Sequence, residues 1–443
     1  MKEYTLAQNR WYGDEPTTIS LPDDWDVQFL SSRGDERSAL SAEQIRERFR
    51  HPVGSRTIRE LAENAEQVVI VFDDLTRGTP VQPIAEAVLE ELHAAGIPKN
   101  HIRFICGTGL HGAHSRNDFA RKLGERIIRE YAVFNHNPYD NCAEVGFTPN
   151  GIRVSLNREF LSCDLKIAIG GVVPHPLNGF GGGGKIIMPG IASAETINGT
   201  HATKVKSSMS GGKNPLAGSG NLSDDSFRSE VEACCCLSGL NVVCDALLNT
   251  RCEMWELVVG DPLEAYYEAV RRADGMYGVK LGGQKNVVIA NANAKAREAG
   301  IAIVTGDTKV VQRGAADKLF INTAGMGAIP ANIHWGAQTL SVGDVLLDFT
   351  PGQCVHFGSG PMGFLPDMGG RAYSGIRDRI SLMKRLIVYS PYPDYTSACW
   401  FCKPEQMIWC ETWDEVLALI SDNGPGTTAA IFSDATIQYI EHE

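Results

Sequence analysis

Residue types that can do chemistry gather most densely between residues 171 and 201, GVVPHPLNGFGGGGKIIMPGIASAETINGTH, where a glycine run leads into one lysine. Five of the six residues from Gly179 to Gly184 are glycine, and Lys185 follows, with His175 before it and His201 after it. Glycines lack the side chain that would keep a bound group away from the backbone. The pattern indicates a site that holds a phosphate, a cofactor or a metal centre.

The same run has the beginning of a nucleotide phosphate loop, in which four residues separate two glycines and a lysine follows. Ile186 stands where that loop needs Ser or Thr for magnesium, and Pro189 lies where its helix should run. This break argues against nucleotide hydrolysis. A purely structural glycine turn is an alternative, but it leaves the lysine among histidines unexplained.

Two other loops carry side chains suited to catalysis. In DLTRGTP, Asp74 and Arg77 lie in a turn where the guanidinium could grip a substrate carboxylate with two bonds. The alternative is that Asp74 and Arg77 pair with each other and only fix the loop. In GTGLH, His111 could transfer protons near neutral pH, whereas we expect the nearby His114 to be an ordinary surface residue.

The elements that position these loops repeat one pattern, in which an apolar β-branched run precedes an amphipathic segment. This alternation predicts an α/β fold with mostly parallel sheets, where ligand sites collect at the carboxyl ends of strands. Asp74, His111 and His175 fall just past such ends and should form a rim. The runs are VVIVFDD at 68–74, HIRFICGTG at 101–109 and LKIAIGGVV at 165–173.

A second α/β stretch begins near NVVIANANA at 286–294, so we expect two α/β domains with an active-site cleft between them. The first domain would span residues 1–282, and a segment at about 425–443 would return to it. The second domain would span residues 283–424. Residues 207–225, rich in Ser, Gly and Asn, are expected to be an exposed loop. Further strands are expected at 344–349 and 385–390.

Composition limits the function classes. The chain has 443 residues, 43% hydrophobic, and a thinly spread net charge of −12, which argues against nucleic acid as partner. No stretch reaches the roughly 18 apolar residues of a membrane helix, and the N-terminus lacks signal-peptide features, so a cytoplasmic location without a membrane partner is expected.

The twelve cysteines are expected to be reduced thiols. The consecutive Cys234, Cys235 and Cys236 would need awkward geometry to ligate one ion. Cys399 and Cys402 lack a second pair of ligands for zinc. Buried or incidental thiols are therefore the simpler interpretation, with a redox role for Cys399 and Cys402 as the alternative.

Taken together, four motifs resemble the lactate racemase family of nickel-pincer enzymes. In that family a lysine bonds covalently to a pyridinium-derived pincer nucleotide, and a histidine sixteen positions later completes the nickel coordination; here 201 − 185 = 16. The resemblance covers about residues 40–295 and resumes from 352 towards the C-terminus. The motifs are DLTR at 74–77, GTGLH at 107–111, NHNPYD at 135–140 and the block at 171–201.

The resemblance implies a role for each matching residue. Three pincer atoms and one imidazole would give nickel a near-planar four-coordinate geometry that it commonly accepts, and the cofactor phosphate would lie on a loop rich in N–H donors. The implied roles are Lys185 as tether, His201 as nickel ligand, His111 and His175 as proton-transfer residues, Thr76, Gly182, Gly183 and Gly184 as cofactor contacts, and Asp74, Arg77 and Lys295 as substrate contacts.

The activity implied is racemisation or epimerisation at C2 of a 2-hydroxy acid, with lactate as the default substrate. One histidine would remove the hydroxyl proton while hydride leaves C2, and the second would return a proton after hydride re-adds to the other face. Implied partners are the small 2-hydroxy acid and the proteins that make the cofactor and insert nickel.

Residues from about 296 to 345 break the pattern and resemble a stretch of the hydrogenase-maturation dehydratases, which bind ATP. The match is local, so we interpret it as an inserted or replaced segment. Two alternatives to racemisation follow: an ATP-binding enzyme of the dehydratase type, or a non-catalytic carrier of the cofactor or of nickel. Retention of His111 and His175 favours catalysis, because a carrier needs no acid–base pair.

Overall fold

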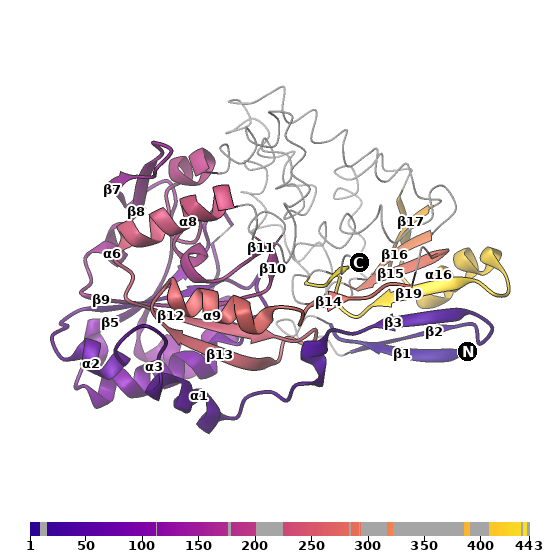
Figure 1. Ribbon diagram of the computed structural model, residues 1–443, viewed down its shortest axis with the longest axis horizontal. Coiled ribbons are helices and arrows are strands. Elements are labelled where there is room, and N and C mark those ends of the chain that lie inside the picture. The colour runs from indigo at the N-terminus through magenta and orange to yellow at the C-terminus, as the bar shows by residue number, and fades with distance from the viewer. Residues whose placement is uncertain are drawn as a thin grey trace. The chain divides into compact units, whose positions relative to one another are not determined.

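A computed structural model of the chain separates into two compact units, described here one at a time (Figure 1). One unit is Arg37–Met276, and the other joins Met1–Glu36 to Tyr277–Glu443. The structure describes residues 1–8, 16–111, 113–175, 179–200, 225–282, 285–291, 293, 317–321, 385–389, 407–435 and 437–440.

The unit Arg37–Met276 is built on a six-stranded sheet with the order β13-β12-β9-β4-β5-β6. Neighbouring strands are parallel except for the antiparallel pair β12 and β13. All six residues of β4 are buried, as expected for a central parallel strand that is covered on both faces. The strands are β4 (Val68–Asp73), β5 (Ile102–Gly107), β6 (Ala132–Asn135), β9 (Leu165–Gly171), β12 (Val242–Leu248) and β13 (Met254–Gly260).

Helices lie on both sides of this sheet. Figure 1 shows α1, α2 and α3 on one side and α8 and α9 on the other. α3 buries Ile84, Val88 and Leu92 along one face, the spacing of an amphipathic helix. The helices are α1 (Ala42–Arg50), α2 (Ile58–Ala62), α3 (Val81–Ala94), α4 (Arg116–Leu123), α5 (Glu125–Glu130), α6 (Arg158–Leu161), α8 (Asp225–Ser238) and α9 (Glu264–Ala273).

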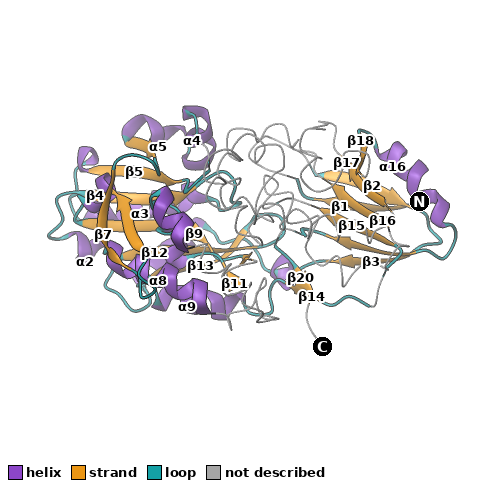
Figure 2. Ribbon diagram, turned by 90° about the horizontal axis from the view of Figure 1, so that it is seen from above, coloured by secondary structure: helices purple, strands orange, loops and turns teal. Residues whose placement is uncertain are grey.

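The other unit contains a six-stranded parallel sheet with the order β18-β17-β16-β15-β19-β3. An N-terminal hairpin, β1 (Lys2–Leu6) with β2 (Thr17–Leu21), packs into the same apolar core, and Figure 2 shows it beside the sheet. Remaining elements are β3 (Asp26–Leu30), β14 (Gly278–Val279), β15 (Val287–Asn291), β16 (Asp317–Ile321), β17 (Arg385–Tyr389), β18 (Met407–Cys410), α16 (Trp413–Ile420), β19 (Thr428–Phe432) and β20 (Tyr439–Ile440).

The predicted α/β class with mostly parallel sheets is confirmed, but the units divide differently from the expected 1–282 and 283–424. β3 pairs with β19, and β19 pairs with β15. Residues 1–36 and about 425–443 therefore belong with the C-terminal unit, because strand pairing between distant segments leaves no local trace in the sequence. The expected cleft between domains stays a prediction.

The amphipathic segment after the His111 loop forms two short helices, α4 and α5, separated by one residue. Gly124 ends α4 with φ of +82°, a conformation that glycine adopts without steric cost. The expected strand at 344–349 and most of the expected loop at 207–225 lie outside the described residues.

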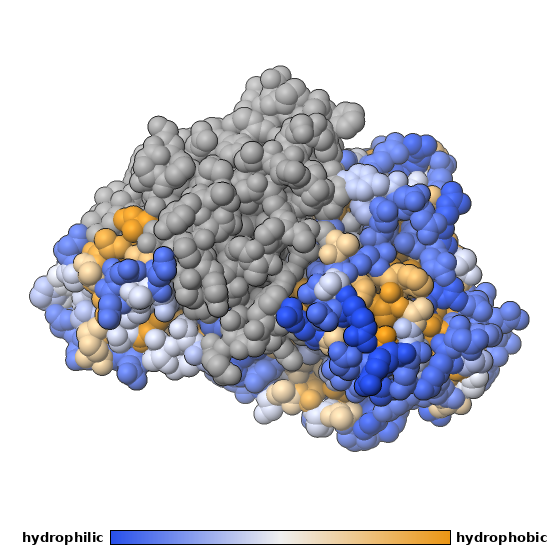
Figure 3. All heavy atoms as spheres, turned by 180° about the vertical axis from the view of Figure 1, so that it is seen from behind, coloured by the Kyte–Doolittle hydropathy of each residue, from blue (hydrophilic) through white to orange (hydrophobic). Residues whose placement is uncertain are grey.

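The face of the molecule in Figure 3 is mostly hydrophilic in its described part, with apolar side chains in small areas. Among the described helices, none has the length and apolar character needed to cross a membrane.

The glycine run is packed tightly against the protein itself. It follows the short hairpin β10 (Pro174–His175) with β11 (Gly179–Phe180) and leads into the 3-10 helix η4 (Gly183–Ile186). A Cβ at Gly182 would lie 2.4 Å from Val172, and one at Gly183 would lie 2.8 Å from the Tyr266 ring. Both glycines also have positive φ, +87° and +55°. Packing therefore explains these glycines before any ligand is considered.

A buried carboxylate anchors the same turn. Asp245 in β12 accepts hydrogen bonds from the backbone N–H of Gly183, with N···O distances of 2.9 and 3.1 Å. Burial raises the pKa of Asp245 to about 7. The backbone donor satisfies a charge-bearing group that would otherwise be costly to bury.

The NHNPYD motif is held by a buried histidine. Nε2 of His136 lies 2.9 Å from the Ala192 carbonyl, and Nδ1 lies 3.1 Å from Nδ2 of Asn157. Since a carbonyl only accepts, Nε2 carries the proton and Nδ1 accepts from the amide. Burial lowers the pKa of His136 to about 4, so the ring is neutral and ties the motif to the segment that follows the glycine turn.

Alanine at Gly183 should destabilise the protein more than alanine at Gly239. Gly239 has a similar φ, +68°, but open space around its Cβ position, so its replacement should cost about 1–2 kcal/mol from the backbone alone. Gly183→Ala adds the contact with the fully buried Tyr266 ring, for about 1–3 kcal/mol more. Urea denaturation of both variants measures the difference. Equal losses would contradict the packing explanation.

The free energy of unfolding should fall as the pH drops from about 6.5 to 4, partly because of His136. In this range the unfolded chain binds a proton at residue 136 and the native state does not. This difference lowers the free energy of unfolding by about 3 kcal/mol. His136→Gln keeps an amide donor and cannot titrate. The difference in unfolding free energy between this variant and wild type should therefore change by that amount over this pH range. His51→Gln, at an exposed site, is the control; parallel pH curves for all three proteins would refute the assignment.

Candidate active site

Three loops with polar side chains meet at one edge of the sheet in the unit Arg37–Met276. β9, β4 and β5 are adjacent and parallel, so their carboxyl ends lie together. The backbone N–H of Gly109, after β5, donates to the carbonyl of Gly190 at 2.8 Å. A Cβ at Gly171, the end of β9, would lie 2.7 Å from Oγ1 of Thr79 in the loop after β4. The predicted rim thus follows neighbouring strands.

Asp74 and His111 form a close pair on two of these loops. Oδ2 of Asp74 lies 2.6 Å from Nδ1 of His111, and the side chains are 2% and 19% exposed. A carboxylate only accepts hydrogen bonds, so Nδ1 donates and Nε2 is the nitrogen left to exchange a proton with a ligand. Burial raises the pKa of Asp74, but His111 and His114 lower it further, and the pKa ends well below its ordinary value. Asp74 is therefore charged and orients the imidazole.

The second carboxylate oxygen of Asp74 fixes the turn that follows. Oδ1 accepts from the backbone N–H of Thr76 at 2.9 Å and from its hydroxyl at 2.5 Å. Nη1 of Arg77 donates to the same hydroxyl oxygen at 3.0 Å. Asp74 is thus engaged with His111 and Thr76, in an arrangement different from the simple Asp–Arg pair considered as an alternative.

His114 is buried, contrary to the expectation of an ordinary surface residue. It is 7% exposed, and its Nε2 accepts from the backbone N–H of Leu75 at 3.4 Å. Its backbone exchanges hydrogen bonds with the Asn135 side chain at 2.9 Å each. The ring therefore packs beneath the Asp74 turn, a contact between loops that sequence position alone does not reveal.

Lys185 and His175 are brought together on the third loop. Nζ of Lys185 lies 2.9 Å from Nε2 of His175 and 5.8 Å from the centroid of the Phe227 ring. His175 is 5% exposed. An ammonium group donates, so Nε2 of His175 is the acceptor in this contact. The lysine amine and one imidazole thus lie within hydrogen-bond distance of each other.

The described residues give two clusters on one sheet edge: Asp74, Thr76, Arg77 and His111 in one, and His175 with Lys185 in the other. Gly182, Gly183 and Gly184 lie in the turn before Lys185. His201 and Lys295 lie outside the described residues. Within the described part of the chain, no group of three or more His, Cys, Asp or Glu side chains could hold a metal ion.

Most thiols of the described cysteines are buried. The nine cysteines that the structure describes are free. Burial raises the pKa of Cys234 and of Cys235 to about 12, so neither is a thiolate at neutral pH. Cys399 and Cys402 lie outside the described residues.

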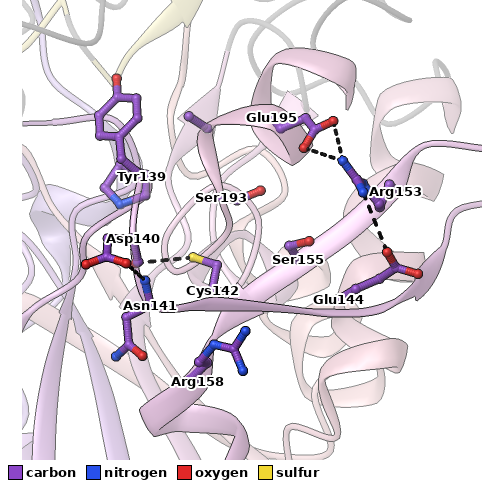
Figure 4. Close-up of a pocket in the computed structure, with 12 residues that line it drawn as sticks. Tyr139, Asp140, Asn141, Cys142, Glu144, Arg153, Ser155, Arg158, Ser193 and Glu195 are labelled. Atoms are coloured by element: carbon purple, nitrogen blue, oxygen red, sulfur yellow. Dashed lines mark hydrogen bonds and ion pairs between the residues drawn. The ribbon is translucent and has the colours of Figure 1, made fainter.

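An open cavity of about 670 Å³ lies beside the NHNPYD motif (Figure 4). Its lining includes Tyr139 and the hairpin of β7 (Cys142–Phe147) with β8 (Arg153–Asn157), and none of the predicted site residues. Arg153 pairs with Glu195 at 2.8 Å and Glu144 at 3.8 Å. The cavity is therefore polar, and no residue that lines it belongs to the cluster around Asp74 or to the cluster of His175 and Lys185.

Comparison with known proteins agrees with the motifs. Residues 12–212 match the family model described as the lactate racemase N-terminal domain. The lactate racemase of Thermoanaerobacterium thermosaccharolyticum is 28% identical over 224 residues, 50% of this chain and 51% of that one. The lactate racemase of Lactiplantibacillus plantarum is 30% identical over 191 residues, 43% of each chain. The chain thus spans about half the length of these relatives.

A shorter stretch has a different relative. Over 60 residues, the chain is 82% identical to the carbamoyl dehydratase HypE of Escherichia coli. These residues make up 14% of this chain and 18% of that protein. The expected local resemblance to hydrogenase-maturation dehydratases is therefore confirmed, and it spans about a fifth of that enzyme.

Solved structures show the same fold. The lactate racemase apoprotein from Thermoanaerobacterium thermosaccharolyticum aligns with a TM-score of 0.70 at 18% identity and covers all of both chains. A Thermotoga maritima protein aligns with a TM-score of 0.63 at 15% identity, over 91% of this chain and all of that one. Residues 12–212 thus match the lactate racemase N-terminal domain model, and the chain resembles the lactate racemases in motifs and in fold.

Proposed function

We propose that the protein is a racemase or epimerase that inverts C2 of a 2-hydroxy acid, lactate or a related acid, with a nickel-pincer nucleotide tethered at Lys185. The observation that carries the proposal is the placement of two histidines, His111 held by Asp74 and His175 beside Lys185, on loops at one sheet edge. Inversion through a 2-keto acid that rotates needs an acid–base group near each of the two positions that its C2 oxygen occupies. The lactate racemase N-terminal domain supports this class of reaction.

His111 is proposed to exchange a proton with the substrate hydroxyl through Nε2. The hydrogen bond from Nδ1 to Asp74 fixes the tautomer and the ring orientation. The negative charge of Asp74 stabilises the imidazolium that forms when Nε2 takes the proton. Because the Asp74 pKa lies well below its ordinary value, this support persists across the physiological pH range.

His175 is proposed to serve the opposite face. Its Nε2 accepts from Lys185 in this structure, and conversion of the Lys185 amine to a covalent link would release that lone pair for substrate. When bound, the cofactor would accept the C2 hydrogen as hydride and return it. Between the two histidines the 2-keto acid would rotate, and the second histidine would then supply the proton to its oxygen.

The described residues supply part of the contacts that a nickel-pincer nucleotide would need. Lys185 provides an amine in a partly buried position, Thr76 has a hydroxyl beside His111, and the turn of Gly182, Gly183 and Gly184 provides backbone. His201 is proposed as nickel ligand. Arg77 and Lys295 are proposed to bind the substrate carboxylate. We also propose that the protein acts in the cytoplasm with the proteins that make the cofactor and insert nickel.

Co-expression with those cofactor-making proteins should add a nucleotide-sized mass and about one nickel per chain. Lys185→Ala should lose both, because the amine forms the link. Intact-mass spectrometry and metal analysis measure the two. Lys166→Ala, a partly buried lysine whose Nζ bonds the Cys163 carbonyl, is the matched control and should keep both. The proposal would be contradicted if the wild type carried neither adduct nor nickel while cofactor synthesis was verified in a known racemase.

Replacement of either histidine should slow inversion strongly without unfolding the protein. His111→Asn and His175→Asn should each lower the rate of inversion by about 10²–10⁴-fold, the usual contribution of a positioned acid–base group. Chiral chromatography of lactate and related acids measures the rate. His51→Asn, at an exposed site, should be unaffected. Inversion within tenfold of wild type in either site variant would refute the two-histidine mechanism.

A further inference from the structure

A buried ion pair lies directly behind the turn that carries Arg77. Nζ of Lys122 in α4 is 2.8 Å from Oδ1 of Asp73, the last residue of β4, and the Lys122 side chain is 1% exposed. The same Nζ donates to the backbone carbonyl of Arg77 at 2.9 Å. Oδ2 of Asp73 accepts from Oγ1 of Thr79 at 2.6 Å.

Stability is a poor explanation for this pair. Taking two charges out of water costs several kcal/mol per ion, and well-packed apolar residues of similar size are often as stable or more so. Lysine and aspartate are also uncommon at positions as buried as these, where the side chains are 1% and 11% exposed. A role in specifying one local conformation accounts better for them, because each contact of the pair falls on the turn.

The contacts hold the turn from Asp74 to Pro80 at three points. Asp73 precedes it, Thr79 is bonded near its end, and the Arg77 carbonyl is bonded in its middle. Lys122 also belongs to the helix that follows the His111 loop and begins at the cap Ser115. The ion pair therefore connects the backbone of the Arg77 turn to the helix that follows the His111 loop.

We propose that Asp73 and Lys122 are positioning residues, which fix the backbone at Arg77 so that its guanidinium meets the substrate carboxylate at the right place relative to His111. The part of this inference that concerns substrate rests on the proposed function. The part that concerns order in the turn does not.

The test is a double variant, Asp73→Asn with Lys122→Met, which removes both charges so that neither is left buried and unpaired. Asn keeps an acceptor for Thr79, and Met matches the lysine stem. Arg121→Met, on the same helix with a side chain 43% exposed, is the matched control. Thermal unfolding establishes that the variants are folded.

The first measurement is hydrogen–deuterium exchange of the protein without cofactor. Amides in the peptide that spans the turn should exchange at least about tenfold faster in the double variant, while those of β4 and β5 stay as in wild type. Arg121→Met should match wild type throughout. Unchanged exchange in the turn of a folded double variant would overturn the inference, whatever reaction the protein catalyses.

The second measurement uses the loaded enzyme. Since Lys185 is untouched, adduct and nickel should be unchanged, and KM should rise about tenfold or more with kcat within a few-fold, the pattern of lost substrate binding. An unchanged KM would overturn the role of the pair in holding Arg77. Failure of wild type to load or to invert a 2-hydroxy acid would instead count against the proposed function.

A milder pair of variants keeps the test decisive if the double variant does not fold. Thr79→Val removes only the hydroxyl that bonds Asp73, while Thr79→Ser retains it. Faster exchange in the turn of the valine variant, with serine like wild type, would support the inference. Equal exchange in both would contradict it.

Discussion

The parallel pairing of β9, β4 and β5 is the constraint on which the candidate site depends. Residues far apart in the chain acquire a common location only because these strands run in one direction and end at one edge. Short loops then need few contacts to complete the arrangement. Asp74, after β4, contacts His111, which lies after the adjacent strand β5. The glycine turn brings Lys185 back to His175. The chemistry is carried by loops, and its precision comes from the sheet.

The two clusters differ in how their side chains are held. In one, a charged carboxylate sets the orientation of an imidazole and of the turn beside it. In the other, positive φ values and close packing against Val172 and Tyr266 leave the backbone of the glycine turn little freedom. The first cluster is fixed by electrostatics and the second by steric exclusion. A charge-neutralising substitution should therefore disturb the first much more than the second.

The sequence predicted local features well and distant contacts poorly. β4, β5, β9 and α3 were visible as apolar runs or periodic faces, and the spacing from Lys185 to His201 contributed to the resemblance to the lactate racemases. The partners of Asp245 and Lys122, the burial of His114 and the pairing of β3 with β19 were not visible, because each depends on segments distant in sequence. A charged residue inside an apolar strand, such as Asp245 in VVCDALL, is a signal from which a buried anchor could have been predicted.

The adjacent carboxylates Asp73 and Asp74 have a consequence for strand alignment. The apolar run of β4 is buried on both faces, so hydrophobic pattern alone specifies its register only weakly. The carboxylates do specify it, because Asp73 meets Lys122 and Asp74 meets His111. A slip of one residue would turn each carboxylate to the opposite face of the sheet, away from its partner, and leave it buried without a counterion. The two carboxylates that order the candidate site therefore also specify the register of the central strand.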